Sequence, residues 1–284
     1  MPVTEHQRVD PSGTSPEVVV RLSGVSVGYD ERAVVRDVDL TVAKGEVVAV
    51  LGANGSGKTT LMRGLLGLAT VLAGEAEVLG DAIGSRRTRG RVGYVPQRQT
   101  VGGTIPSTVR EVVASGRLPR RPLLGRRRAA DREAVQRAIT AVDLEPWADT
   151  DIAQLSGGQQ RRALIARALA SEPEVMIMDE PTAGVDLASQ NALAATIRRL
   201  VERGVTLLVV THEIGPLEGV VTRAVVVRDG RIAHDGPLHH EGTHAHLRSG
   251  GDVGMDVHDD AHHVHDPLDP EQAPGWLEHP IGER

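Results

Sequence analysis

A glycine-rich segment contains the residues whose types and spacing point most directly to chemistry. It reads Gly52-Ala53-Asn54-Gly55-Ser56-Gly57-Lys58-Thr59 and follows the apolar run 47–51. The segment fits the P-loop pattern G-x-x-x-x-G-K-[ST] at every fixed position. In that pattern backbone N–H groups and a helix N-terminus bind phosphate oxygens, Lys58 reaches the β- and γ-phosphates, and Thr59 ligates Mg²⁺. A glycine-rich turn that binds nothing is the alternative.

The scarcity of lysine favours the phosphate-binding interpretation. Lysine and arginine together number 32, and only Lys44 and Lys58 are lysines. A compact ammonium group fits a phosphate cradle where the broad planar guanidinium would not. The choice of lysine at position 58 therefore indicates a functional requirement.

The segments that must position this loop alternate between strands and helices. We expect strands at 18–22, 34–42, 47–51, 75–79, 91–95, 174–179, 205–210, 225–227 and 231–234, and helices at 58–68, 108–115, 129–143, 157–170 and 188–201. Tyr29 is expected in the turn between the first two strands. Several of the later strands are apolar without alternation, as in strands covered on both faces. The pattern predicts an α/β fold with a largely parallel central sheet.

Composition and charge exclude several classes of protein. The 284 residues include no cysteine, which excludes disulfides and thiolate metal sites, and no apolar run of 18 residues that could span a membrane. Residues 237–284 hold ten Asp and Glu against two Arg, so a net charge of −6 for the chain leaves +2 on residues 1–236. Residues 1–236 are therefore nearly neutral, and the chain has only two Trp, two Tyr and no Phe. A nucleic-acid-binding protein would need a basic surface or aromatic residues that stack on bases, so this class is not favoured.

A second motif narrows the function. The sequence Leu155-Ser156-Gly157-Gly158-Gln159 is followed, 20 residues after Gln159, by the pair Asp179-Glu180. With these residues the chain resembles the ATP-binding subunits of ABC transporters, because LSGGQ is that family's signature and VMIMDEPTAGVD at 175–186 is similar to its Walker B strand and D-loop. The resemblance implies a P-loop NTPase with a RecA-like core, an antiparallel β subdomain and an α-helical subdomain.

Three further positions are similar to the family's functional residues and stand in the family's order. Tyr29 resembles the aromatic residue that stacks on adenine, Gln97 the Q-loop glutamine and His212 the switch histidine. The resemblance implies Lys58, Gln97, Glu180 and His212 as catalytic residues and Thr59, Gln97 and Asp179 as Mg²⁺ ligands. The implied ATP contacts are Tyr29, Gly52, Asn54, Gly55, Ser56, Gly57, Lys58, Thr59, Thr60, Ser156, Gly157, Gly158 and Gln159.

The chemistry of phosphoryl transfer gives the acidic pair and its neighbours distinct roles. Catalysis of this reaction is positioning plus electrostatic stabilisation. Asp179, at the end of an expected buried strand, could hold Mg²⁺ directly or through water, and Glu180 could act as the general base for the attacking water. His212 could contact the γ-phosphate and orient that water. Gln97 precedes an expected mobile loop and could reach Mg²⁺ when the site closes.

The signature motif implies that one chain is insufficient. Ser156 and the N–H groups of Gly157 and Gly158 are expected at the start of a helix, where an anion is stabilised. The P-loop already occupies one face of the ATP. In the family this second helix end caps the γ-phosphate of ATP held by another subunit, so the resemblance implies an ATP-dependent head-to-tail dimer with two composite sites.

A separate segment bears on the transported cargo. Residues 104–113 and the pair Gly116-Arg117 are similar to zinc- and manganese-type metal importers. Iron-siderophore and cobalamin importers have related segments, and an exported molecule stays possible. A soluble ABC ATPase of cofactor assembly or DNA repair is the rival from another class, although the long coiled-coil insertion of repair relatives does not fit in the roughly 95 residues between P-loop and signature. The arginines of 117–128 form either a solvated loop or a patch against anionic lipid.

The C-terminal segment is unusually rich in histidine. Nine histidines lie within 234–265, at positions 234, 239, 240, 244, 246, 258, 262, 263 and 265. The densest group, His258, His262, His263 and His265, lies among aspartates, and imidazoles with carboxylates can bind Zn²⁺, Ni²⁺, Cu²⁺ or Mn²⁺. An acidic disordered tail with incidental histidines is the alternative.

These observations give an expected organisation. A flexible lead at 1–17 precedes an ATPase domain at 18–236 with a helical subdomain at about 98–170, and 237–284 forms a tail. ATP and Mg²⁺ are the expected cofactors. The expected partners are a second copy of the chain, a transmembrane permease and, in an importer, an extracytoplasmic solute-binding protein, but no nucleic acid. The chain would lie peripherally at the cytoplasmic face of the membrane.

Overall fold

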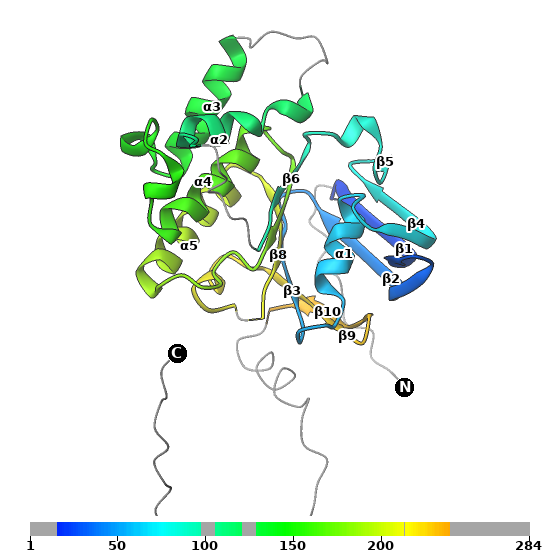
Figure 1. Cartoon of the computed structure of the whole chain (residues 1–284). Helices are drawn as coiled ribbons and strands as arrows, with labels where there is room; N and C mark the ends of the chain where they lie inside the picture. Colours follow the sequence, from blue (N-terminus) through cyan, green and yellow to red (C-terminus); the bar gives the residue numbers. More distant parts are fainter. Residues whose placement is uncertain (1–15, 98–105, 121–128, 213, 239–284) are drawn as a thin grey trace, which may run out of the picture.

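A six-stranded sheet forms the centre of the protein (Figure 1). The computed structural model describes residues 16–97, 106–120, 129–212 and 214–238. The strand order is β10 (Arg231–Pro237), β9 (Arg223–Arg228), β3 (Val47–Leu51), β8 (Thr206–Val210), β7 (Val175–Asp179) and β6 (Val92–Val95). All neighbours pair in parallel except β10, which is antiparallel to β9. The largely parallel core expected from the sequence is confirmed.

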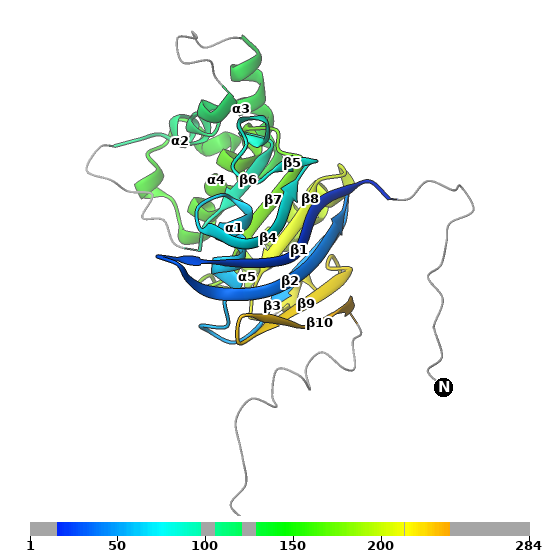
Figure 2. The same ribbon diagram turned by 90° about the vertical axis from the view of Figure 1, so that its right-hand side faces the viewer.

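A second, antiparallel sheet packs beside the first (Figure 2). Its order is β2 (Arg32–Ala43), β1 (Val18–Tyr29), β4 (Thr70–Val78) and β5 (Asp81–Ala82). Helix α1 (Lys58–Leu65) lies between the two sheets and contributes Leu61, Met62 and Leu65 to their shared core. This sheet is the antiparallel β subdomain that the sequence resemblance implies.

The opposite face of the central sheet is covered by helices (Figure 1). These are α2 (Val109–Ser115), α3 (Ala129–Ala141), α4 (Gly157–Ala170) and α5 (Leu187–Glu202). Strand β3 explains why the central strands show no polar alternation, because Val47 and Ala49 face the helices while Val48 and Val50 face the antiparallel sheet. Short 3₁₀ helices occur at Arg86–Thr88, Leu118–Arg120, Glu145–Trp147, Ile152–Gln154 and Gly215–Leu217. No described helix is long and apolar enough to cross a membrane.

Several boundaries differ from the sequence expectation. Helix α1 ends at Leu65 rather than at position 68, because Gly67 adopts φ 68° and turns the chain, which leaves Leu68 62% exposed. Tyr29 is the last residue of β1, and Asp30 and Glu31 with φ 45° and 64° form the turn. Strand β4 begins at Thr70 instead of 75, and β5 was not expected, since a two-residue strand leaves no periodicity to detect.

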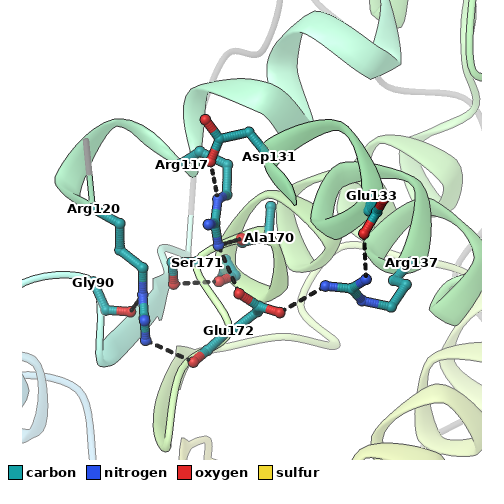
Figure 3. Close-up of polar contacts among 10 residues, drawn as sticks. Gly90, Arg117, Arg120, Asp131, Glu133, Arg137, Ala170, Ser171 and Glu172 are labelled. Atoms are coloured by element: carbon teal, nitrogen blue, oxygen red, sulfur yellow. Dashed lines mark hydrogen bonds and ion pairs between the residues drawn. The ribbon is translucent and has the colours of Figure 1, made fainter. Parts of the chain in front are cut away.

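The position of Arg117 corrects, for this residue, both interpretations of the arginine-rich segment (Figure 3). It is only 8% exposed, so it belongs neither to a solvated loop nor to a lipid-facing patch. Its guanidinium donates to Asp131 at 2.9 Å, to the Ala170 carbonyl at 2.9 Å and to Glu172 at 2.8 Å. A buried ion needs such partners to offset its desolvation. Arg117 therefore joins α3 to the end of α4.

Arg120 extends this network to the residues just before β6 (Figure 3). Its side chain donates to the carbonyl of Gly90, just before β6, and to the carbonyl of Glu172. Glu172 also accepts from Arg137 of α3 at 2.8 Å. The helical layer is thus attached to the central sheet by directional bonds as well as by apolar packing. The remaining arginines of the segment, at 121–128, lie outside the described residues.

Candidate functional site

The P-loop connects the carboxyl end of β3 to α1. Gly52, Gly55 and Gly57 adopt φ 152°, 81° and 107°, which residues with a Cβ rarely adopt. A Cβ on Gly52 would collide with the Val227 carbonyl oxygen, and one on Gly57 would lie 2.9 Å from Val35 Cγ2. The loop therefore requires glycine at positions 52 and 57 for both conformation and space.

Lys58 points back into the loop that precedes it. Its Nζ donates to the carbonyl oxygens of Gly52 at 2.7 Å and Ala53 at 2.9 Å. The residue is 6% exposed, and burial lowers the pKa of its ammonium while the nearby Glu180 and Asp179 oppose that shift. The ammonium is therefore held at the centre of the cradle, among oxygens that an anionic ligand can replace.

A cavity of about 240 Å³ opens over the P-loop. It is lined by Val34, Asn54, Gly55, Gly57, Lys58, Thr59, Thr60, Gln97 and Glu180. The fold thus brings Gln97 and Glu180, two of the catalytic residues that the sequence resemblance implies, to the glycine-rich loop. This convergence follows from the sheet topology, since parallel strands present their carboxyl ends, and the loops after them, at one edge.

Asp179 is the last residue of β7 and is 2% exposed. Burial and the charge of Glu180 raise the pKa of its carboxyl, while a hydrogen bond with the Thr59 hydroxyl partly opposes them. Its Oδ1 is buried without a hydrogen-bond partner among the described residues. A buried carboxylate oxygen without a partner, next to a hydroxyl that belongs to the phosphate loop, fits a hard cation such as Mg²⁺.

Glu180 is held in an unusual backbone conformation. Its φ of 47° lies in the left-handed region, which costs an L-residue about 1–2 kcal/mol, and its N–H donates to the Val210 carbonyl at 2.8 Å. Its side chain is 7% exposed, and its Oε2 lies 2.9 Å from Nδ1 of His212. Strain of this kind persists where the surroundings fix a functional geometry. The glutamate and the histidine form a pair at the edge of the cavity.

The signature residues do not join this cavity in a single chain. Ser156 is the N-cap of α4, its Oγ accepts from Gln159 N–H at 3.3 Å, and Gln159 Oε1 accepts from Ser156 N–H at 2.9 Å. Ser156 and Gly157 are exposed, and neither lines the P-loop cavity. The cap thus leaves the helix N-terminus accessible from outside the chain.

Gly158 has a packing requirement that the sequence did not indicate. A Cβ at this position would lie 2.5 Å from Ser189 Oγ and 2.8 Å from Ser189 Cβ. Ser189 belongs to the first turn of α5. It is hydrogen-bonded to Asp186, which is the N-cap of this helix and the last residue of the segment 175–186. The second glycine of the signature therefore allows α4 and α5 to approach each other.

Two further sets of predicted site residues do not join the cavity. Tyr29 is 38% exposed, does not line the cavity, and accepts a hydrogen bond from Arg63 at 3.3 Å. The candidate metal ligands His258, His262, His263 and His265 lie outside the described residues. Within the described part of the chain no group of three His, Cys, Asp or Glu residues is arranged to hold a metal ion.

The sequence reasoning missed two polar residues of the site. Tyr94 of β6 is half-buried, and burial together with the charge of Asp179 raises the pKa of its hydroxyl. Arg161 of α4 is 8% exposed. A signal for Arg161 was present, because it lies three and four residues before Leu164 and Ile165 and so falls on the apolar face of the helix. A charged residue on a buried face requires specific partners.

Comparison with known proteins agrees with the geometry. The family model described as ABC transporter matches residues 35–183. The manganese transport system ATP-binding protein MntB of Bacillus subtilis is 40% identical over 70% of this chain and 79% of its own length. The zinc transport system ATP-binding protein TroB of Treponema pallidum is 35% identical over 75% and 80%. The structure of cbiO1 from Clostridium perfringens, part of the ABC transporter complex cbiONQ, superposes with a TM-score of 0.69 at 25% identity, over 78% of this chain and 89% of that one.

Proposed function

This chain belongs to the ABC transporter family, as an ATP-hydrolysing subunit, and on that premise we propose that it drives the import of a divalent transition metal, manganese or zinc. The observation that carries the ATPase assignment is the P-loop cavity, which gathers Lys58, Gln97 and Glu180 around a glycine cradle. Beside it lies Asp179 with a buried oxygen that has no partner among the described residues.

We assign the roles of the site residues as follows. The P-loop glycines with Asn54, Ser56, Lys58 and Thr60 bind the triphosphate of ATP, and Thr59 and Asp179 hold Mg²⁺. Mg²⁺ neutralises charge on the phosphates when it is bound. Glu180 takes the proton of the attacking water, and its contact with Nδ1 of His212 supports this role because the histidine can orient the carboxylate. Gln97 would reach Mg²⁺ when the site closes, and Tyr29 would contact the adenine.

Dimerisation is the second part of the proposal. The N-terminus of α4 is exposed at Ser156 and Gly157 and lies outside the cavity of its own chain. A helix N-terminus is an anion site, and Gln159 rigidifies it through the capping box. A second copy placed head to tail would bring this end to the γ-phosphate on the first. ATP would then close two composite sites, and hydrolysis would open them.

The remaining partners follow from the same premise. A transmembrane permease would receive the motion of the closing dimer, and a solute-binding protein would deliver the metal outside the membrane. The chain itself would be peripheral, at the cytoplasmic face. Manganese and zinc are proposed as cargo because MntB of Bacillus subtilis and TroB of Treponema pallidum carry these metals in their names and match most of this chain.

Reconstitution with the permease from the same organism tests the cargo. We expect vesicles that hold this subunit and ATP on the inside to take up Mn²⁺ or Zn²⁺, because an importer moves its cargo to the side of its ATPase subunit. We expect no uptake with Lys58→Ala, because the P-loop then lacks its ammonium. Parallel vesicles receive a ferric siderophore and cobalamin. Accumulation of either of these without manganese or zinc transport would contradict the metal assignment while leaving the ATPase intact.

We further propose that the tail binds the transported metal, with His258, His262, His263 and His265 as ligands. Support comes from their density beside aspartates in the sequence. Deletion of 239–284 is expected to remove weak Zn²⁺ binding measured by calorimetry. It should leave Mg-ATP hydrolysis without added transition metal within about twofold, because the described residues that line the P-loop cavity all lie between positions 34 and 180. A matched variant with these four histidines changed to Gln retains the length and the acidic residues. Unchanged zinc affinity in both variants would refute tail binding.

A further inference from the structure

Arg161 of α4 makes five hydrogen bonds, all to backbone carbonyl oxygens. Its Nε donates to Pro181 at 3.0 Å. Its Nη1 donates to Pro96 at 2.6 Å and Gln97 at 3.0 Å. Its Nη2 donates to Asp179 at 2.8 Å and Glu180 at 2.7 Å. The guanidinium has five N–H groups, so its whole donor capacity is directed at these two segments.

Three of the five carbonyl partners belong to residues with proposed roles in ATP hydrolysis, namely Gln97, Asp179 and Glu180. One set follows β6 and includes Gln97, and the other begins at the last residue of β7 and includes Asp179 and Glu180. Arg161 itself lies in α4 five residues after Ser156, the cap of the signature helix. The side chain of Arg161 thus connects the signature helix to the loop after β6 and to the loop after β7.

Burial of the Arg161 guanidinium costs desolvation free energy, which its hydrogen bonds must offset. A guanidinium that is 8% exposed is strongly desolvated, and burial lowers its pKa. Carbonyl dipoles offset that cost only when every N–H is satisfied in good geometry. Glu180 adopts φ 47°, so its peptide needs external restraint, and the bond from Arg161 to its carbonyl supplies that restraint beside the bond from its N–H to Val210.

We propose that Arg161 is a positioning residue for ATP hydrolysis, which fixes the backbones of Glu180 and Gln97 to the signature helix so that the three move as one body. The inference rests on the proposed roles of these residues. In a head-to-tail dimer, the signature helix contacts the nucleotide of the partner while Glu180 acts on its own. Arg161 would therefore couple occupancy of one composite site to the geometry of the other.

Arg161→Lys tests the proposal, because an ammonium has three donors in place of a five-donor fork. In the purified full-length chain we expect kcat for ATP to fall on the order of 10- to 100-fold, as for a misplaced catalytic group. The Kd for ATP without hydrolysis should stay within about twofold, since the P-loop contacts are intact. Hydrogen exchange in peptide 176–184 of the nucleotide-free protein should be faster by about tenfold, and exchange in 47–51 should not change.

Arg162→Lys is the matched control. Arg162 is the next residue of the same helix and donates to one carbonyl, that of Val142, at 3.1 Å. Its variant should equal the wild type in kcat, Kd and exchange. A kcat of the Arg161→Lys chain within about threefold of wild type would overturn the proposal, as would an equal loss of ATP affinity together with faster exchange throughout the chain. A wild-type chain that hydrolyses no ATP would refute the proposed function, and the exchange comparison would still decide whether Arg161 holds the loop.

Discussion

Replacement of Glu180 with Gln is expected to lower the rate of ATP hydrolysis by about 10²- to 10⁴-fold, the range associated with loss of a general base. The amide has nearly the shape of the carboxylate, so the pocket beside His212 and the backbone bond from Glu180 to Val210 are preserved. Nucleotide affinity should stay close to wild type because the P-loop is unchanged. Phosphate release and fluorescent-nucleotide binding measure these two quantities separately.

The same variant should accumulate as an ATP-bound dimer. If hydrolysis opens the two composite sites, a chain that binds ATP without cleaving it remains closed. Light scattering at saturating Mg-ATP should give twice the mass of the nucleotide-free protein. Glu202→Gln, at an exposed position near the end of α5, is the control and should hydrolyse ATP normally. A Glu180→Gln chain that stays monomeric with bound ATP would contradict the head-to-tail model.

Replacement of Asp179 with Asn is expected to lower ATP hydrolysis by about 10²-fold or more, because the metal side of the site loses its carboxylate. It should also raise the thermal stability of the nucleotide-free protein at neutral pH. Burial and Glu180 raise the pKa of Asp179 above its ordinary value of 3.8, so the ionised form is less favourable in the folded protein than in the unfolded chain. A neutral amide removes that penalty.

The sign of this effect gives it a defined pH dependence. A carboxyl whose pKa is raised by folding contributes stability below its unfolded pKa, and this contribution is lost as the pH rises through its folded pKa. The stability gain of Asp179→Asn over wild type should thus be largest at pH 7 and shrink toward pH 4, as chemical denaturation can measure. Asp149→Asn is the matched control for the stability measurement. The Arg110 guanidinium lowers the pKa of the Asp149 carboxyl, so replacing this carboxylate with an amide should not stabilise the protein. Equal or lower stability of the Asp179 variant at pH 7 would contradict the argument.

The two variants separate function from folding. Both acidic residues lie buried at the carboxyl end of β7, yet they differ in what surrounds them. Glu180 has a partner in His212, whereas Asp179 has an oxygen without one among the described residues. A gain in stability at the expense of activity at position 179 would identify a residue retained for binding Mg²⁺.

The sequence by itself determined the fold class and most of the phosphate site. The pattern around Lys58 is contiguous, and its chemistry follows from the loop's own backbone, so no distant contact is needed to predict it. The bounds of α4 agreed with the structure for the same reason, because Ser156 and Gln159 form a cap within one turn. Asp179 and Glu180 were identifiable because they end the unbroken apolar run 175–178, which forms most of β7.

Only the tertiary structure decided how these pieces are held together. The carbonyl partners of Arg161 lie up to 65 positions away along the chain, and the Glu172 partner of Arg117 lies 55 away. Hydrophobic periodicity reports which face of an element is buried, but it does not report which backbone oxygen will lie opposite a buried donor. That depends on how strands and helices pack in three dimensions, and for the same reason Arg117 belongs to the interior although its sequence neighbours suggested the surface.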